Sequence, residues 1–185
     1  MNITLKVLDF WLEDTDQGRS IREVWFKKDE KFDQAIHDRF LDDYERASMG
    51  VYDGIAETPE GSLALVIMLD QFPRNLFRGS PRAFSTDAKA RQVSISALER
   101  GFDALLRPFQ KMFLYLPFEH SEVLEDQERS VMLFKALGND NLIDYAHRHR
   151  DIIARFGRFP HRNAALGRES TEEELVFLST PGSSF

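Results

Sequence analysis

The chain has 185 residues, a formal net charge of −7, a hydrophobic fraction of 42%, a charged fraction of 30%, and no cysteine. This composition is typical of one globular domain, and the lack of cysteine excludes disulfides, thiolate metal sites and cysteine nucleophiles. The acidic balance argues against nonspecific nucleic-acid binding, which needs a basic face. No stretch approaches the ~20 consecutive apolar residues of a transmembrane helix, and the acidic N-terminus is unlike a signal peptide. We expect a cytoplasmic protein that binds neither nucleic acid nor membranes.

Helical patterns fill the first half of the chain. They predict a helix over residues 5–12, a second from the N-cap Asp29 to Gly50, and a third that begins at Thr58-Pro59 and contains the apolar run 63–69. Pro73 is expected to break the third helix or to turn it sharply. Residues 21–26 form the only strand candidate, and it is short.

Caps and apolar periodicity predict the remaining helices. They are a helix capped by Ser85 or Thr86 and ending at Gly101, an aromatic helix opened by Pro108, a helix over 118–137, a helix from the N-cap Asn141 to Phe156, and a last helix with a Ser170–Glu173 capping box. The sequence therefore predicts one all-α domain over 1–185, built from antiparallel helix pairs, with a loose tail at 180–185.

The first polar segment, 69–79, follows the most apolar helix. It contains Asp70, Gln71, Arg74 and Asn75 between apolar residues. Polar groups attached to an apolar helix are expected to be partly buried, and buried charges must be paired. A ligand site and a structural Asp–Arg network are about equally favoured here.

The second polar segment, 115–127, places His120 between Glu119 and Glu122 after an aromatic stretch. A histidine beside a carboxylate suits general acid–base chemistry. At helical spacing Glu119, Glu122 and Asp126 share one face, for which a solvated surface is favoured over a site.

The third polar segment, 145–168, carries six arginines against one acid, Asp151. Pro160 is expected to start a short helix whose first turn holds His161, Arg162 and Asn163. Backbone N–H groups at a helix N-terminus beside guanidinium groups, including that of Arg158, make an anion site. The alternative is a rigid helix corner whose arginines pair with acids of the N-terminal third.

The strings LDQFPRN, PFEHSE and RFGRFPHRN resemble the bacterial domain-of-unknown-function family numbered 924. The resemblance covers residues 7–178. It implies an all-helical fold of the tetratricopeptide-like superfamily and no activity. The family's motif residues fall here on Asp70, Gln71, Arg74, Asn75, His120, Ser121, Glu122, Arg158, His161, Arg162 and Asn163.

Two hypotheses follow for function. In the first, the arginines of the first and third segments, with the polar residues beside them, bind a small carboxylate or phosphate, with or without catalysis in which His120 or His161 moves a proton and Glu122 orients the imidazole. Arg74, His120 and residues 158–163 would then surround one cavity. In the second, the helices form a scaffold for a protein or peptide partner.

No metal or cofactor is expected. His147 and His149 point about 200° apart on a helix and cannot share an ion there. The chain also has no phosphate-binding glycine loop and no dinucleotide fingerprint.

Overall fold

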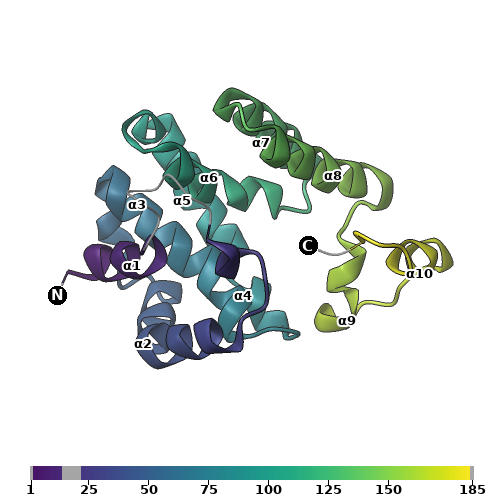
Figure 1. The fold of residues 1–185 in the computed structure, drawn as a ribbon, viewed down its shortest axis with the longest axis horizontal. Helices are drawn as coiled ribbons and strands as arrows, with labels where there is room; N and C mark the ends of the chain where they lie inside the picture. The colour runs from purple at the N-terminus through teal and green to yellow at the C-terminus, as the bar shows by residue number, and fades with distance from the viewer. Residues whose placement is uncertain (1, 14–21, 184–185) are drawn as a thin grey trace. The chain divides into compact units, whose positions relative to one another are not determined.

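The computed structural model describes residues 2–13 and 22–183 (Figure 1). Over these residues the regular structure is helical and contains no strand, which confirms the all-α prediction. The tetratricopeptide-like arrangement stays a prediction. Among the helices of this part of the chain, none is both long and apolar enough to cross a membrane.

The chain divides into two compact units, which are described separately. Unit 1 comprises residues 1–78 and 82–117, and unit 2 comprises residues 79–81 and 118–185. The expectation of a single domain stays a prediction.

Unit 1 contains the N-terminal helices and most of α6. Its elements are α1 (Ile3–Trp11), η1 (Glu23–Trp25), α2 (Glu30–Ser48), η2 (Asp53–Glu57), α3 (Pro59–Val66), η3 (Ile67–Gln71), α4 (Phe72–Leu76), η4 (Pro81–Phe84, which begins at the boundary), α5 (Asp87–Glu99), η5 (Phe102–Leu105) and α6 (Pro108–Glu119, whose last turn belongs to unit 2).

An aromatic core joins α1, α2, α4 and α6 in unit 1. The Trp11 ring lies 5.7 Å from Phe72 and 5.5 Å from Phe113, and Phe40 lies 4.8 Å from Phe72, measured between ring centroids. All four side chains are almost completely buried. Large buried aromatic side chains contribute strongly to core stability, so these contacts hold the four helices together.

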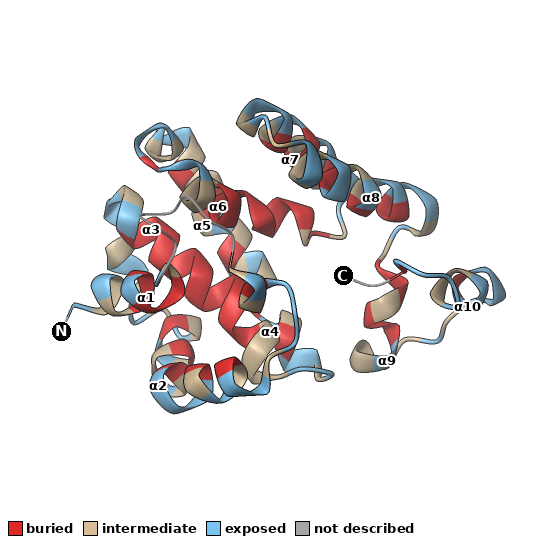
Figure 2. Ribbon diagram, viewed as in Figure 1, coloured by how far each residue is buried: buried red, intermediate tan, exposed pale blue. Residues whose placement is uncertain are grey.

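The most apolar helix does not break at Pro73, so the expected break was wrong. The helix runs from α3 through the π-helical turn η3 into α4, and Figure 2 shows it buried over most of its length. In the π turn the Phe72 N–H donates to Ile67 O. Pro73 has no N–H for the Leu69 carbonyl, which instead accepts a hydrogen bond from Thr86 Oγ1 at 2.5 Å. The extra residue of the π turn and this hydroxyl allow the proline to be accommodated.

Unit 2 begins with the last turn of α6 and contains the C-terminal helices. Its elements are α7 (Leu124–Leu137), α8 (Asp140–Phe156), η6 (Pro160–Arg162), α9 (Asn163–Leu166) and α10 (Glu172–Leu178). α7 and α8 lie side by side as a helical hairpin (Figure 1). Ile152, Ile153 and Phe159 form a small core, covered by Phe156 and Phe177.

The caps predicted at Asp29 and Thr58 are confirmed. Asp29 Oδ1 accepts the Phe32 N–H at 2.9 Å, and Thr58 Oγ1 accepts the Gly61 N–H at 3.1 Å. Both side chains satisfy a backbone N–H that has no partner within the helix.

Three boundaries in unit 2 differ from the prediction. α6 continues to Glu119 and α7 starts at Leu124, so no helix begins at 118. α8 is capped by Asn139, whose extended backbone follows the left-handed Gly138, and not by Asn141. The capping box of α10 consists of Thr171 and Glu174, one residue later than predicted.

The strand candidate and the predicted loose tail also differ from the prediction. Residues 23–25 of the strand candidate form the 3₁₀ turn η1, while Ile21 lies outside the described residues. In the predicted loose tail, Ser183 is buried and donates from Oγ to Leu178 O at 3.1 Å, and residues 184–185 lie outside the described part.

Candidate functional site

Three side chains of unit 2 that can carry positive charge lie around the buried Phe159 ring, and one of them contacts the backbone of a fourth residue, His120. We call His120, His149, His161 and Arg162 the histidine–arginine cluster. The His149 and His161 rings lie 5.6 and 5.5 Å from the Phe159 ring, and the Arg162 guanidinium lies 4.6 Å from it. Arg162 Nη2 donates to His120 O at 2.9 Å. Segments far apart in sequence (the residue after α6, α8, and η6) thus meet in one place.

His149 is buried and electrically neutral. Its Nδ1 lies 2.8 Å from Tyr145 O, and because a carbonyl only accepts, Nδ1 must carry the proton. Burial lowers the pKa of His149 to about 3, and the charges of His120, His161 and Arg162 act in the same direction. Glu119 Oε1 lies 3.7 Å from Nδ1, and burial outweighs the attraction of this carboxylate for a charged imidazole.

The backbone of His120 is fixed by side chains from other elements. Gln127, which is fully buried on α7, donates from Nε2 to Glu119 O at 2.6 Å and to Ser121 O at 2.7 Å. Arg162 donates a hydrogen bond to the carbonyl between them, that of His120. The last carbonyls of a helix have no partner within it, so these donors satisfy the end of α6 and set the position of His120.

Glu122 holds the turn that presents His161 and Arg162. Its carboxylate accepts the Phe159 N–H at 2.7 Å and the two terminal nitrogens of Arg168 at 2.7 and 2.9 Å. Burial opposes the charge of Glu122, but the hydrogen bonds from Arg168 and Phe159 lower its pKa below the usual value. In these contacts Glu122 anchors the start of η6, and its predicted role of orienting an imidazole stays a prediction.

Arg158 and Asn163 contact a buried carboxylate, that of Glu174. Arg158 donates from Nε and Nη2 to Glu174 at 2.6 and 2.7 Å, and Asn163 Nδ2 lies 3.3 Å from the same group. The Thr171 N–H adds a bond of 2.8 Å. Hydrogen bonding to Arg158 is the main reason that the pKa of Glu174 is lowered to about 2. These contacts clamp α10 to the residues that precede and follow η6.

The first polar segment forms an ion-pair network within unit 1. The side chain of Asp70 is completely buried and accepts a hydrogen bond from Gln71 Nε2 at 2.6 Å. Arg74 donates to both oxygens of Asp87 at 3.0 Å and also to the Asp70 carbonyl.

The rest of this segment binds Asp33 of α2. Asn75 Nδ2 lies 2.8 Å from Asp33 Oδ1, and Arg78 lies 2.6 and 2.8 Å from the two oxygens. The predicted cavity would need Arg74 of unit 1 together with His120 and residues 158–163 of unit 2. It stays a prediction.

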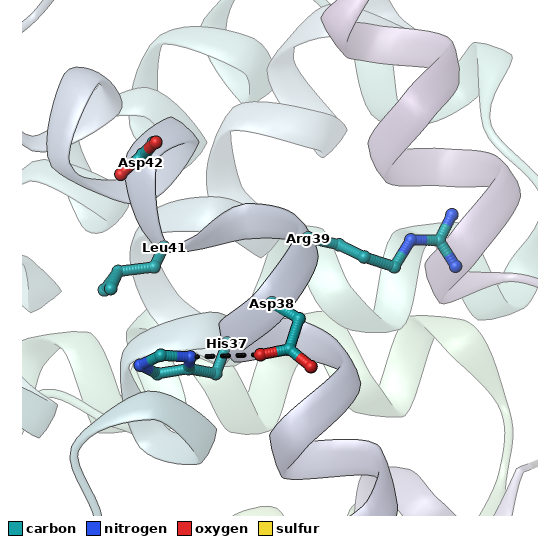
Figure 3. Close-up of a pocket in the computed structure, with 5 residues that line it drawn as sticks. All are labelled: His37, Asp38, Arg39, Leu41 and Asp42. Carbon is teal, nitrogen blue, oxygen red and sulfur yellow. Dashed lines mark hydrogen bonds and ion pairs between the residues drawn. The ribbon is translucent and has the colours of Figure 1, made fainter.

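A hollow of about 290 Å³ lies on the surface of α2 and is lined by His37, Asp38, Arg39, Leu41 and Asp42 (Figure 3). Four of these residues are exposed, and His37 Nδ1 lies 3.4 Å from Asp38 Oδ1. Exposed charges of both signs bind small ligands weakly because water competes for them. The hollow on α2 is therefore not a strong candidate site. Across residues 2–13 and 22–183, no three His, Asp or Glu side chains are placed to hold a metal ion.

Sequence reasoning missed His149 and Arg168 as members of the site. His149 was considered only as a partner of His147 for a metal. The spacing of Ala146, His149 and Ile153 does place His149 on the apolar face of α8, so a periodicity signal for its burial exists. No comparable signal identifies Glu122 as the partner of Arg168.

Comparison with known proteins places the chain in a family. The family model described as "Bacterial protein of unknown function (DUF924)" matches residues 7–182. The solved structure of the protein of unknown function ATU0120 from Agrobacterium tumefaciens is similar, with 42% identity and a TM-score of 0.88, over 96% of this chain and 97% of that chain. None of the curated proteins matches. The chain belongs to the bacterial DUF924 family.

Proposed function

We propose that the histidine–arginine cluster binds a small anion, a carboxylate or a phosphate. The observation that carries this proposal is the meeting of the His149 and His161 imidazoles and the Arg162 guanidinium around the buried ring of Phe159. The same guanidinium donates to the backbone carbonyl of His120. Two carboxylates lie near them. Glu122 is paired with Arg168, and Glu119 Oε1 lies 3.7 Å from His149 Nδ1. Protonation of His120 or His161 would add positive charge to that of Arg162, and this added charge supports the proposal of a negative ligand.

Each member of the cluster has a distinct part in this proposal. Arg162 is buried and supplies a planar guanidinium, which suits an oxyanion and interacts strongly in a region of low dielectric constant. His120 and His161 are half-buried, and an imidazole is the side chain whose charge changes near neutral pH. Either could add charge to the site, and either could move a proton to or from a bound substrate. His149 would remain the neutral, fixed member.

The test is the binding of inorganic sulfate to the full chain. Isothermal titration calorimetry measures the affinity, and the shift in melting temperature provides an independent readout. A ligand at 100 times its Kd stabilises the native state by about 2.7 kcal/mol, which a melting curve resolves easily. Arg162→Gln and His161→Gln should each weaken sulfate binding at least ~tenfold, the loss of one charge-assisted hydrogen bond.

Arg148→Gln is the matched control, because Arg148 belongs to the same unit but is exposed and pairs with Asp144 one helical turn away. Circular dichroism checks that each variant keeps its helices. Sulfate binding that is as strong in both cluster variants as in the Arg148 variant would contradict the proposal.

A helical scaffold for a protein or peptide partner is the second candidate function. It is favoured by the pairing of Arg74, Arg158 and Arg168 with carboxylates, since these arginines then serve to link helices. On this hypothesis sulfate leaves the melting temperature unchanged, while Arg158→Gln lowers it in the presence and absence of sulfate alike.

A further inference from the structure

The buried face of α7 carries two polar side chains, Gln127 and Ser130, beside the apolar Val131 and Phe134. Both polar residues are fully buried, at 0% exposure. Over residues 2–13 and 22–183, neither Gln127 Oε1 nor Ser130 Oγ makes a hydrogen bond. Proteins rarely leave such atoms unpaired, because a buried polar group without a partner costs free energy.

The amide of Gln127 cannot be turned round to satisfy its oxygen. Its Nε2 donates to Glu119 O at 2.6 Å and to Ser121 O at 2.7 Å. Because a carbonyl only accepts, exchanging the two ends of the amide would lose both bonds and place oxygen against oxygen. Oε1 therefore stays on the other arm of the amide, where it requires a donor.

Ser130 follows Gln127 by about one helical turn. Residues three apart on a helix are neighbours on one face, with Cβ atoms about 5–6 Å apart. The hydroxyl of Ser130 can both donate and accept, so it is chemically matched to a group that bonds the amide oxygen. The two side chains do not bond one another directly. A molecule that joins them must donate to Oε1 and either donate to Oγ or accept from it.

We propose that unit 2 has a binding site for an internal water molecule between Gln127 Oε1 and Ser130 Oγ. Water meets both requirements, and buried waters commonly satisfy polar groups of this kind. An ion fits less well, because two neutral oxygens do not offset the cost of removing an ion from solvent. The water completes the polar contacts by which Gln127 holds the last turn of α6. The site is independent of the proposed anion site.

A crystal structure of the full chain, at a resolution that shows ordered water, tests the site directly. We expect density for one water molecule within about 2.7–3.2 Å of both Gln127 Oε1 and Ser130 Oγ. Absence of this density overturns the proposal, whether the two side chains then bond each other or Ser130 donates to a backbone carbonyl of its own helix. A water molecule bound to Gln127 alone overturns the assignment of Ser130 to the site.

Two serine variants test the same site in solution by their melting temperatures. Ser130→Ala removes one of the two anchors of the water and should lower the melting temperature by about 2–4 °C. Ser94→Ala is the matched control. Ser94 is also fully buried within a helix and makes no hydrogen bond to the described residues, but it lies between Ala90 and Ala97 on the buried face of α5, with no amide on that face.

Alanine is the better helix former and buries no polar group, so Ser94→Ala should keep or raise the melting temperature. A lower melting temperature for Ser130→Ala alone supports the site. Equal shifts in the two variants, or a higher melting temperature for Ser130→Ala, overturn the assignment of Ser130. Circular dichroism checks that both variants keep their helices.

Discussion

Lowering the pH from 7.5 to 5.0 should destabilise the ligand-free protein through His149. In the unfolded chain this side chain takes up a proton near pH 6.5, the usual histidine pKa. In the native state burial lowers the pKa to about 3, so the native protein stays unprotonated at His149 over this range. The unfolded state thus binds more protons, and stability rises with pH. The contribution is fully present above about pH 6.5 and is lost progressively as the pH falls toward 3.

The magnitude follows from the distance between pH 5.0 and the unfolded pKa. That interval is 1.5 pH units, and each unit is worth about 1.4 kcal/mol, so His149 should cost the native state about 2 kcal/mol at pH 5.0.

Urea unfolding at pH 7.5, 6.5, 5.5 and 5.0, in sulfonate buffers free of sulfate and phosphate, gives the free energy of unfolding at each pH. The comparison is between the wild type and His149→Asn, which keeps a donor for Tyr145 O but cannot titrate. Between pH 7.5 and 5.0 the wild type should lose about 2 kcal/mol more than this variant. His147→Asn should follow the wild type. Parallel pH profiles for wild type and His149→Asn would refute the reasoning, because His149 would then be protonated equally in the native and unfolded states.

Three further substitutions test the contacts that hold the helices. Thr86→Val should lower the free energy of unfolding by about 1–2 kcal/mol in urea, because the Leu69 carbonyl loses its donor, whereas Thr86→Ser should retain most of the stability. Gln127→Leu should cost about 1–3 kcal/mol by the same assay, since the end of α6 loses its buried cap; a neutral effect would show that water replaces the amide. Glu174→Gln should lower the melting temperature by roughly 5 °C and expose α10 to proteolysis, because Arg158 loses its buried counter-ion; unchanged proteolysis would argue against the clamp.

Helix existence was readable from the sequence, whereas several helix ends were not. Apolar residues recurring every three or four positions identify α2 and α8, because one face of each must be buried. The residue at which a helix begins depends on which of two nearby polar residues caps it. Asn139 and Asn141 have the same chemistry, and only the left-handed turn at Gly138 decides for Asn139. Thr171 and Ser170 pose the same choice.

The polar residues of the site were predictable as a set, but their partners were not. His120, His161 and Arg162 were singled out by their neighbours in sequence, and they do meet in unit 2. The partners Glu122–Arg168 and Arg158–Glu174 are 46 and 16 residues apart, and local patterns carry no information at such separations. The sequence also placed Glu122 on a continuous helix, which the turn between α6 and α7 removes.

The π-helical turn of η3 contains one extra residue, and this residue sets the direction in which the later side chains of the long helix point. Each residue of an α-helix turns the chain by about 100°, so the extra residue rotates everything after it by that angle. Because of this rotation, Leu63–Val66 can be buried in the core while Arg74, farther along the same helix, points toward Asp87. A deletion of one residue within Ile67–Gln71 would restore regular α-helical bonding and yet direct the charged side chains of α4 toward a different neighbour. Changes of length, which surface loops usually tolerate, are thus ruled out at the centre of this helix.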